Sequence, residues 1–395
     1  MKKGVWQLTG AINDYESLLL SSGWSPELAR LEHQALLRST GGCEPVQERS
    51  LLCTSEGSEK VAARSLLLQE SLHPAAAHEY DVSTNADVVS NWVAESLTST
   101  EGSIVVRATK VGHRLEGWHS REIERDFGAI LHGSGFEIDL HNPDRVFSIF
   151  SLADQDPRHV KKEATSPSLA WGIRRHDNSK WKDSTAPKRP FFKPVSLDPR
   201  LARAMANLAC PNGGSFLDPF CGTGGIPIEA ASIGLDSYGS DRDFEMVAGS
   251  ERNSEWMLDD RGLEAEVTIR HCSATELKDD WGDLAPFDGF AFDPPYGRNS
   301  WKSDDGWNLF IDACAACTGV SHKDSRLVAL MPWPPSCLGH KLMGEDRDDP
   351  EAVTFGMPWL QVLSHLRESG WQVDEFVTIP VHKSLARLLI VCSRA

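Results

Sequence analysis

The sequence predicts an α/β protein: a doubly wound, mostly parallel sheet in the second half, preceded by a separate α+β region. From residue 215 onward, short apolar runs alternate with helical patterns, which is typical of parallel strands joined by crossover helices. A glycine-rich turn follows the first of these runs, and acidic residues follow two of the later ones. A length of 395 residues is enough for two or three domains.

The first half carries helix and strand patterns in no regular alternation. Apolar residues three and four apart predict helices, and Ser25 before Pro26 is a plausible N-cap for the first one. Helices are predicted from 25 through 35 and over 61–72, 86–97 and 121–131. β-Branched and alternating runs predict strands over 5–8, 103–107, 136–140 and 146–152.

A change of composition near residue 153 predicts a linker between the two halves. Residues 153–190 hold few apolar side chains and many charged or small ones. Asp198-Pro199 then begins a helix. The strands of the second half are predicted over 215–218, 236–240, 266–270, 288–292, 326–331, 373–380 and 386–392.

The charge of the chain is strongly acidic, with a formal net value of −17. Taken alone, this charge argues against a nucleic-acid partner, because phosphate binding requires positive charge. The window 156–203 differs, since it holds twelve Lys and Arg against five Asp and Glu. This window is either a solvated linker or a surface that follows a phosphate backbone.

Composition also predicts a cytoplasmic protein with reduced thiols. No apolar run approaches the ~18 residues that span a bilayer, and 18–20 is too short for a signal sequence. The nine cysteines are scattered and odd in number, which does not suit a disulfide framework. Cys314 and Cys317 are interpreted as small apolar residues one helical turn apart, with a metal or redox role as the alternative.

A glycine-rich turn after Asp218 is the strongest local signal for a ligand. Its glycines let the backbone approach a ligand closely, and Pro227 begins the helix that follows. Asp241 ends the next strand, about 20 residues further on, where α/β nucleotide folds hold a ribose diol. Pro227 replaces the third glycine of a dinucleotide motif, and no phosphate-loop lysine is present. The turn therefore favours S-adenosylmethionine, which has no phosphate and whose cationic end Asp218 would meet.

Asp293-Pro294-Pro295-Tyr296 indicates the reaction class. The motif follows a predicted central strand, at the edge where α/β ligands bind. A carboxylate that accepts an N–H from an exocyclic base amine draws the nitrogen lone pair out of conjugation, so that it can attack a methyl group. The two prolines fix the turn, and Tyr296 offers a face on which a flipped base stacks.

Two other segments carry basic residues near this predicted edge. Arg298 and Lys302 follow the motif at once and would contact phosphates that flank the target; a loop without such contacts is the alternative. Residues 382–387 lie between the last two predicted strands, either as a hairpin turn or as part of the substrate entrance.

The combination of Asp-Pro-Phe-Cys-Gly-Thr-Gly-Gly at 218–225 and Asp-Pro-Pro-Tyr-Gly at 293–297 resembles the THUMP-domain tRNA methyltransferases, in particular archaeal tRNA (guanine-10-N2)-dimethyltransferases. Residues 189–209 are similar to the segment before the family's cofactor loop, and 382–387 to its last hairpin. Residues 105–108 and 136–144 are similar to the end of a THUMP domain.

The resemblance implies a Rossmann-like class I methyltransferase domain with seven strands, the last of which form a hairpin, preceded by an α+β ferredoxin-like and THUMP region that binds RNA. The implied domains are a ferredoxin-like module (1–75), a THUMP domain (76–165), a linker (166–188) and the methyltransferase domain (189–395). Candidate residues for S-adenosylmethionine are Asp218, Pro219, Gly222, Thr223, Gly224, Asp241, Ser273 and Ala274. Candidate catalytic residues are Asp293, Pro294, Pro295 and Tyr296. Candidate RNA-binding residues are Arg107, Lys110, Arg114, Arg298 and Lys302.

The chain departs from the family pattern at two positions. Family members carry an Asp-Ala pair whose acid contacts the adenine amine, whereas this chain has Ser273-Ala274. Adenine recognition must then come from Ser273, a backbone group or a neighbour. Lys193 stands where the family often has His.

The sequence therefore predicts an enzyme that methylates the exocyclic N2 of a guanine in tRNA, at position 10, once or twice. An adenine-N6 methyltransferase acting on RNA or DNA is an alternative, because the motif suits any exocyclic amine. A non-catalytic THUMP RNA-binding protein is another. We expect a monomer that binds tRNA, with no metal and no membrane contact, and with a small activating subunit as an optional partner.

Overall fold

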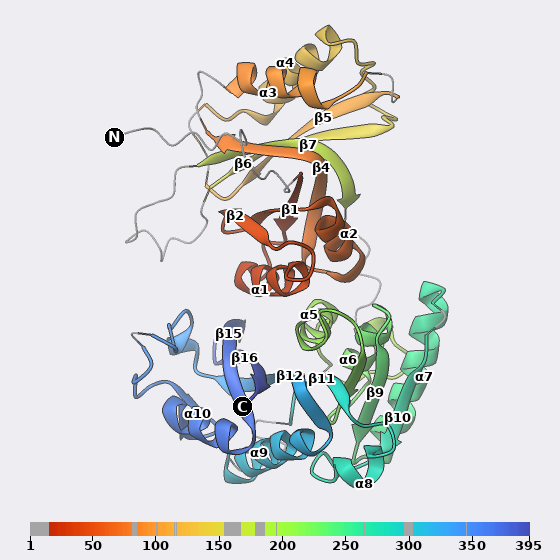
Figure 1. Ribbon diagram of the computed structural model, residues 1–395, viewed down its shortest axis with the longest axis vertical. Coiled ribbons are helices and arrows are strands. Elements are labelled where there is room, and N and C mark those ends of the chain that lie inside the picture. Colours follow the sequence, from red (N-terminus) through yellow and green to blue (C-terminus); the bar gives the residue numbers. More distant parts are fainter. Residues whose placement is uncertain are drawn as a thin grey trace. The chain divides into compact units, whose positions relative to one another are not determined.

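The chain divides into two compact units. The first unit comprises Met1–Ala63 and Leu67–Ser179, and the second comprises Arg64–Leu66 and Lys180–Ala395. Figure 1 labels the helices and strands of both. The computed structural model describes residues 16–80, 85–99, 102–113, 115, 117–153, 167–177, 186–194, 196–263, 265–295, 303–344 and 346–395.

The first unit contains a seven-stranded sheet with the order β2-β3-β1-β4-β7-β6-β5. Its strands are β1 (Ser17–Ser21), β2 (Cys43–Gln47), β3 (Ser50–Cys53), β4 (Leu68–Glu79), β5 (Ile104–Val111), β6 (Arg145–Leu152) and β7 (Ser168–Asp177). Its helices are α1 (Pro26–Leu37), α2 (Ser55–Arg64), α3 (Asn85–Ser96) and α4 (Ser120–Gly133). β5 and β6 pair in parallel, and the other neighbouring strands pair antiparallel.

Apolar faces of the helices bury this sheet in separate clusters. Val93 of α3 and Phe127 of α4 join Ile149 and Trp171 of the sheet in one buried core. Leu36 of α1 belongs to a second cluster with residues of β1 and β3. The predicted helices at 25–35, 86–97 and 121–131 and the predicted strands at 103–107 and 146–152 are confirmed, although Ser25 forms no side-chain cap to α1.

Two predicted elements of the first half are wrong. The helix expected over 61–72 ends at Arg64, and Leu68 begins β4, because Leu68 and Leu72 pair with β1 instead of continuing the helical face. The strand expected over 136–140 makes only an isolated bridge from Ile138 to Ile104 in the described chain. The strand expected over 5–8 lies outside the described residues.

Strand pairing also changes the expected domain limits. β7 occupies 168–177, inside the range expected to be a linker, and it pairs with β4 and β6. Gly172 permits this pairing, since a Cβ there would collide with the Pro74 carbonyl oxygen. β4 crosses the expected boundary at 75/76, so strands on both sides of that boundary share one sheet. Tertiary pairing thus overrides the polar composition on which the linker was predicted.

The second unit contains the sheet predicted from the sequence, with the order β10-β9-β8-β11-β12-β16-β15. Its strands are β8 (Ser215–Asp218), β9 (Asp236–Asp241), β10 (Val267–His271), β11 (Phe287–Phe292), β12 (Ser321–Trp333), β15 (Trp371–His382) and β16 (Leu385–Arg394). β8 to β12 pair in parallel, whereas β16 pairs antiparallel with β12 and with β15. All seven predicted strands of this half, including the terminal hairpin, are confirmed.

Helices cover both faces of this sheet (Figure 1). On one face, α5 (Pro199–Ala209), α6 (Gly225–Ala231) and α7 (Phe244–Arg261) pack in sequence against the parallel strands. On the other face, α9 (Ser303–Gly319) contacts both α8 (Leu277–Trp281) and α10 (Trp359–Glu368). Shorter elements are 3-10 turns at Ala186–Lys188 and Pro335–Cys337 and the ribbon of β13 (Val353–Thr354) and β14 (Met357–Pro358).

The Cys314–Cys317 pair belongs to the core of the second unit. Both thiols are fully buried on α9, in the cluster that contains Phe290 and Trp371. Within the described ranges, no group of three potential metal-ligating side chains comes together. Within those same ranges, no helix is both long and apolar enough to cross a bilayer.

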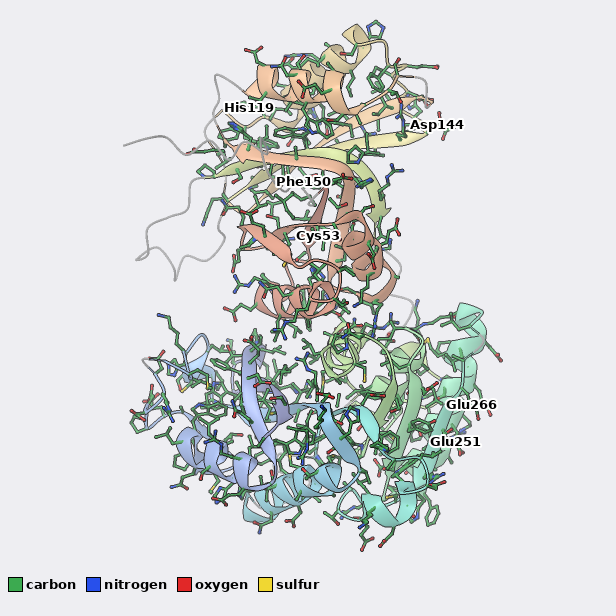
Figure 2. The ribbon with its side chains drawn as sticks, in the orientation of Figure 1. Cys53, His119, Asp144, Phe150, Glu251 and Glu266 are labelled. Carbon is green, nitrogen blue, oxygen red and sulfur yellow. The ribbon has the colours of Figure 1, made fainter. Side chains whose placement is uncertain are left out.

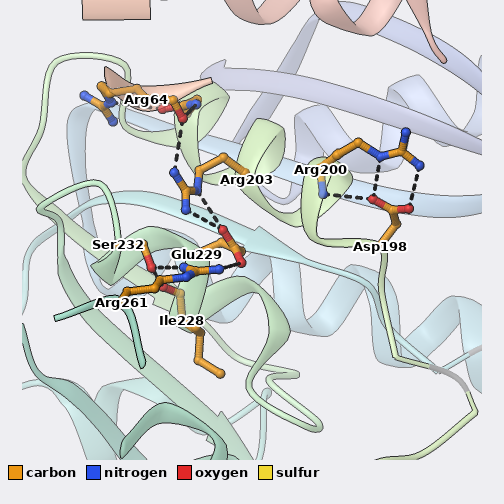
Figure 3. A network of polar contacts seen from close by, with 9 residues as sticks. Arg64, Asp198, Arg200, Arg203, Ile228, Glu229, Ser232 and Arg261 are labelled. Atoms are coloured by element: carbon orange, nitrogen blue, oxygen red, sulfur yellow. Dashed lines mark hydrogen bonds and ion pairs between the residues drawn. The ribbon is translucent and has the colours of Figure 1, made fainter. Parts of the chain in front are cut away.

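A buried ion-pair network joins the three helices on the α5 side (Figure 3). Glu229 of α6 is fully buried and accepts from Arg203 Nε of α5 at 2.8 Å and from Arg261 Nη2 of α7 at 2.7 Å. Arg261 also bonds to Ser232 Oγ. Burial raises the pKa of Glu229, but Arg203 and Arg261 more than offset this effect and hold the pKa below its ordinary value. The network therefore fixes these helices as long as the carboxylate is ionised.

We expect Glu229→Gln to lower the free energy of unfolding by about 3 kcal/mol at neutral pH, because it leaves two arginines with no buried counter-charge. Since the pKa is lowered in the folded state, the contribution is present at neutral pH and is lost as the pH falls through the folded-state pKa. Urea unfolding at pH 7 and pH 4 measures this, with Glu251→Gln at an exposed position of α7 as the control (Figure 2). Equal stabilities of the wild type and Glu229→Gln at pH 7 would contradict it.

Candidate functional site

Three carboxylates lie at the carboxyl edge of the second sheet. Asp218 is the last residue of β8, Asp241 is the last residue of β9, and Asp293 directly follows β11. β8 lies between β9 and β11 and pairs in parallel with both. The three strand ends therefore meet at one edge, which is where ligands of open α/β sheets bind.

The glycine-rich turn after β8 is fixed by hydrogen bonds from its backbone amides to two carboxylates. Gly222 and Gly224 both have positive φ, at 51° and 79°, which an L side chain rarely adopts. Gly222 N donates to Asp241 Oδ2 at 3.1 Å, and Phe220 N donates to Asp218 Oδ1 at 2.9 Å. A Cβ on Gly224 would lie 3.0 Å from Ser250 Cβ. Hydrogen bonds thus hold the backbone of the turn against the carboxylates of Asp218 and Asp241, and the two glycines place no side chain there.

The three carboxyl groups influence one another's ionisation. Burial raises the pKa of Asp218 well above its ordinary value, and the charges of Asp241 and Asp293 raise it further, although the Phe220 amide opposes the shift. Burial likewise raises the pKa of Asp241, while the amides of Asp243 and Gly222 lower it. A cation bound between the strand ends would relieve this repulsion. The edge is therefore suited to a positively charged ligand.

Asn253 of α7 joins residues 189–194 to the glycine turn by hydrogen bonds. It is fully buried, and the sequence did not single it out as a functional residue. Asn253 Oδ1 accepts from Phe191 N at 2.8 Å, and Asn253 Nδ2 donates to Phe191 O and to Thr223 O at 2.8 and 2.9 Å. Ser196 Oγ lies 3.1 Å from Thr223 Oγ1. In the sequence, the one sign of a role for Asn253 is a polar amide side chain within a predicted helical segment. That sign is weak as long as the hydrogen-bond partners of Asn253 are unknown.

Packing reinforces this connection. The Phe191 ring lies against α7 at Gly249, where a Cβ would overlap the ring. Lys193 Nζ and Arg252 Cζ lie 5.2 and 5.7 Å from the ring centroid. Lys193, which replaces the family's frequent His, also pairs with Glu245 at 2.8 Å. Hydrogen bonds and packing therefore hold residues 189–194 in place beside the glycine turn.

Asp293 is paired with a basic residue from the terminal hairpin. Arg387 Nη2 donates to Asp293 Oδ2 at 3.0 Å, and both side chains are about one-fifth exposed. Pro294 is buried and Pro295 is exposed beside it. The sequence predicts that 382–387 form either a hairpin turn or part of the substrate entrance, and no local pattern in it connects Arg387 with Asp293. Tyr296, Arg298 and Lys302 lie outside the described residues.

Ser273 and Ala274 lie beside Asp241. They follow β10, whose last residue, His271, pairs with Asp241, and Cys272 N donates to Asp241 O at 3.1 Å. Ser273 Oγ lies 2.9 Å from Thr275 Oγ1. Two hydroxyls thus occupy the position at which the family pattern has a carboxylate.

The RNA-binding candidates in the first unit lie on β5. Arg107 is half-buried and Lys110 is exposed, and the strand alternation directs them to opposite faces of the sheet. The structure therefore does not bring these two side chains into one patch. Arg114 lies outside the described residues.

Comparison with known proteins agrees with this architecture. The family described as UPF0020: RMKL-like, methyltransferase domain matches residues 187–336. A tRNA (guanine(10)-N2)-dimethyltransferase of Methanothermobacter thermautotrophicus is 30% identical over 75% of this chain and 84% of that protein. The enzyme of the same name from Pyrococcus abyssi is 27% identical over 78% of this chain and 86% of that protein. The crystal structure of a possible methylase from Clostridium difficile 630 is 14% identical, with a TM-score of 0.50 over 96% of this chain and 98% of that chain.

The seven-stranded sheet with its antiparallel hairpin, the glycine turn and the acidic strand ends define a class I methyltransferase that uses S-adenosylmethionine. The identity to the Methanothermobacter thermautotrophicus enzyme extends over most of both chains, and it therefore assigns this protein to a particular family within that class. The chain belongs to the family of tRNA (guanine(10)-N2)-dimethyltransferases.

The residues at the edge fit S-adenosylmethionine. Gly222 and Gly224 give the turn the positive-φ backbone that lets it lie against the strand ends without side chains, and Asp218 is a buried carboxyl group whose negative charge a cationic ligand would balance. Asp241 already accepts from Asp243 N and Gly222 N, which fixes its carboxylate, and each oxygen retains a second lone pair for a hydroxyl donor.

We expect Asp218→Asn to raise the free energy of unfolding of the ligand-free protein by about 1 kcal/mol, because it removes a buried charge and keeps an acceptor for Phe220 N. The raised pKa of Asp218 means that its ionisation destabilises the fold as the pH rises through that pKa. The gain should therefore be greatest at alkaline pH. Thermal unfolding between pH 5 and pH 9 measures it.

The same substitution should weaken S-adenosylmethionine binding at least tenfold, measured by calorimetry. Asp279→Asn, at an exposed position of α8, is the matched control. Unchanged cofactor affinity in Asp218→Asn would show that this carboxylate does not face the cationic end of the cofactor.

Proposed function

We propose that the protein transfers a methyl group from S-adenosylmethionine to the exocyclic N2 of guanine 10 in tRNA. The observation that carries this proposal is Asp293, an ion-paired carboxylate at the end of β11 that lies close enough to Asp218 to raise its pKa. Family membership supports tRNA as the substrate, since the relatives are named for guanine 10.

In this proposal, Asp241 binds the ribose hydroxyls, Asp218 faces the cationic end of the cofactor, and Ser273-Ala274 borders the adenine. The cofactor supplies a methyl group on a positively charged sulfur. Asp293 accepts a hydrogen bond from the guanine N2–H and so localises the lone pair on that nitrogen. On transfer of the methyl group to N2, Asp293 would take up the N2 proton and release it to water.

The expected stacking of the guanine on Tyr296 stays a prediction, because Tyr296 lies outside the described residues. The assignment of the first unit as ferredoxin-like and THUMP modules that hold tRNA also stays a proposal. Its support is the length of the likeness to the relatives, which extends well beyond the methyltransferase domain.

Mass spectrometry of nucleosides from tRNA incubated with the purified chain and labelled cofactor tests the function. We expect N2-methylguanosine or N2,N2-dimethylguanosine in tRNA, and no product in a transcript that carries inosine at position 10, which lacks the N2 amine. Methyladenosine, or label in DNA alone, would support the adenine-N6 alternative and reject the proposal. Product from the purified chain alone would also show that no activating subunit is required.

We expect Asp293→Ala to lower the methylation rate at least a thousandfold and to leave tRNA affinity within a few fold, because the carboxylate acts on the reacting nitrogen. Single-turnover rates and filter binding measure the two quantities. Glu251→Ala, which removes an exposed carboxylate of the same unit (Figure 2), should keep the wild-type rate. A near-normal rate in Asp293→Ala would remove this residue from the mechanism.

A further inference from the structure

The register of the sheet brings Arg387 to the reacting edge. β16 runs antiparallel to β12, and Arg387 pairs with Pro332, three residues beyond Ala329, the partner of Phe292 at the end of β11. Arg387 is therefore level with the residues that follow β11, two strands away. Neighbouring strands are ~4.8 Å apart, so the long Arg387 side chain crosses over β12 to reach Asp293.

The ion pair between Arg387 and Asp293 is neither fully buried nor fully exposed to solvent. Arg387 Nη2 and Asp293 Oδ2 are 3.0 Å apart, and the side chains are 20% and 18% exposed. Both side chains of the pair thus remain partly exposed at the carboxyl edge of the sheet. For comparison, the carboxylate of Glu229 on α6, in its pair with Arg203, is fully buried.

A carboxylate beside a guanidinium presents acceptors next to donors. The Watson–Crick edge of guanine presents two donors, N2–H and N1–H, followed by one acceptor, O6. Adenine presents one donor, N6–H, followed by the N1 acceptor. Guanidinium is planar and carries five N–H donors, so it can bond to a carboxylate and to a second acceptor in the same plane. The Asp293–Arg387 pair therefore complements guanine and mismatches adenine.

We propose that Arg387 is the residue that selects guanine: it holds Asp293 through Oδ2 and donates to guanine O6 while Asp293 accepts from N2–H and N1–H. This inference rests on the proposed function and adds the means by which the site distinguishes the two purines that carry an exocyclic amine. Loss of a charge-assisted hydrogen bond at a desolvated site lowers rates by about 10- to 100-fold.

The test compares two bases at position 10 of tRNA, guanine and 2-aminopurine. 2-Aminopurine keeps the N2 amine but has no O6 and no N1–H, so it removes the contact made by Arg387 on the substrate side. The protein variants are Arg387→Met, which removes the guanidinium, and Arg387→Lys, which keeps the charge without the planar fork. Arg367→Met, at an exposed position of α10, is the control for charge.

We expect kcat/KM on guanine to fall about 10- to 100-fold in Arg387→Met and several-fold in Arg387→Lys. On 2-aminopurine, both variants should stay within about threefold of the wild type, which is itself slow on this base. Arg387→Met should lower the melting temperature, because it leaves Asp293 without its guanidinium partner. Native circular dichroism and retained cofactor binding at the assay temperature would show that the variants are folded.

Equal losses on both bases would overturn the proposal, because Arg387 would then act only by holding Asp293. Undiminished activity on guanine in both variants would overturn it as well. A wild-type protein that binds the cofactor but does not methylate guanine 10 would overturn the proposed function and this inference together, whereas an active wild type with unaffected variants would overturn the inference alone.

Discussion

The convergence of Asp218, Asp241 and Asp293 at one sheet edge is the constraint on which the rest of the site depends. Like charges at neighbouring strand ends repel one another, and burial adds to that cost, as the raised pKa of Asp218 and that of Asp241 show. The protein tolerates the cluster because backbone amides and one arginine donate to it. A positively charged ligand would offset the remaining negative charge. The ligand-free protein is therefore less stable than it would be without the cluster, and the same cluster favours binding of a cation.

A rigid support behind the edge keeps these charges in place. Asn253 ties the 189–194 segment to the glycine turn, and Phe191 packs where α7 has only a glycine. On the same side, Glu229 joins α5, α6 and α7 through two arginines (Figure 3). The helix that begins at the glycine turn, α6, is therefore tied by ion pairs to both neighbouring helices, α5 and α7. These ties limit the motion of the turn relative to the strand ends.

The terminal hairpin gives this class I fold a direct link to its reacting group. Because β16 lies next to β12 and runs antiparallel, its first residues return to the carboxyl edge of the parallel strands. Arg387 uses that return to reach Asp293. The fold itself is shared with many methyltransferases, so selectivity for a base must arise from side chains at the edge, and the Asp293–Arg387 pair is the described contact best suited to it.

The sequence by itself determined the second unit almost completely: seven strands, the glycine turn and the acids at 218, 241 and 293 all follow from local patterns, because periodicity and turn chemistry act over short distances. Only the tertiary structure decided the first unit's sheet. There, β7 and β4 pair across segments whose composition suggested a linker and a helix. It also decided the partners of the site residues, since Asn253 lies 62 residues from Phe191 and Arg387 lies 94 residues from Asp293. Contacts of that separation depend on strand order and register, which no local pattern encodes.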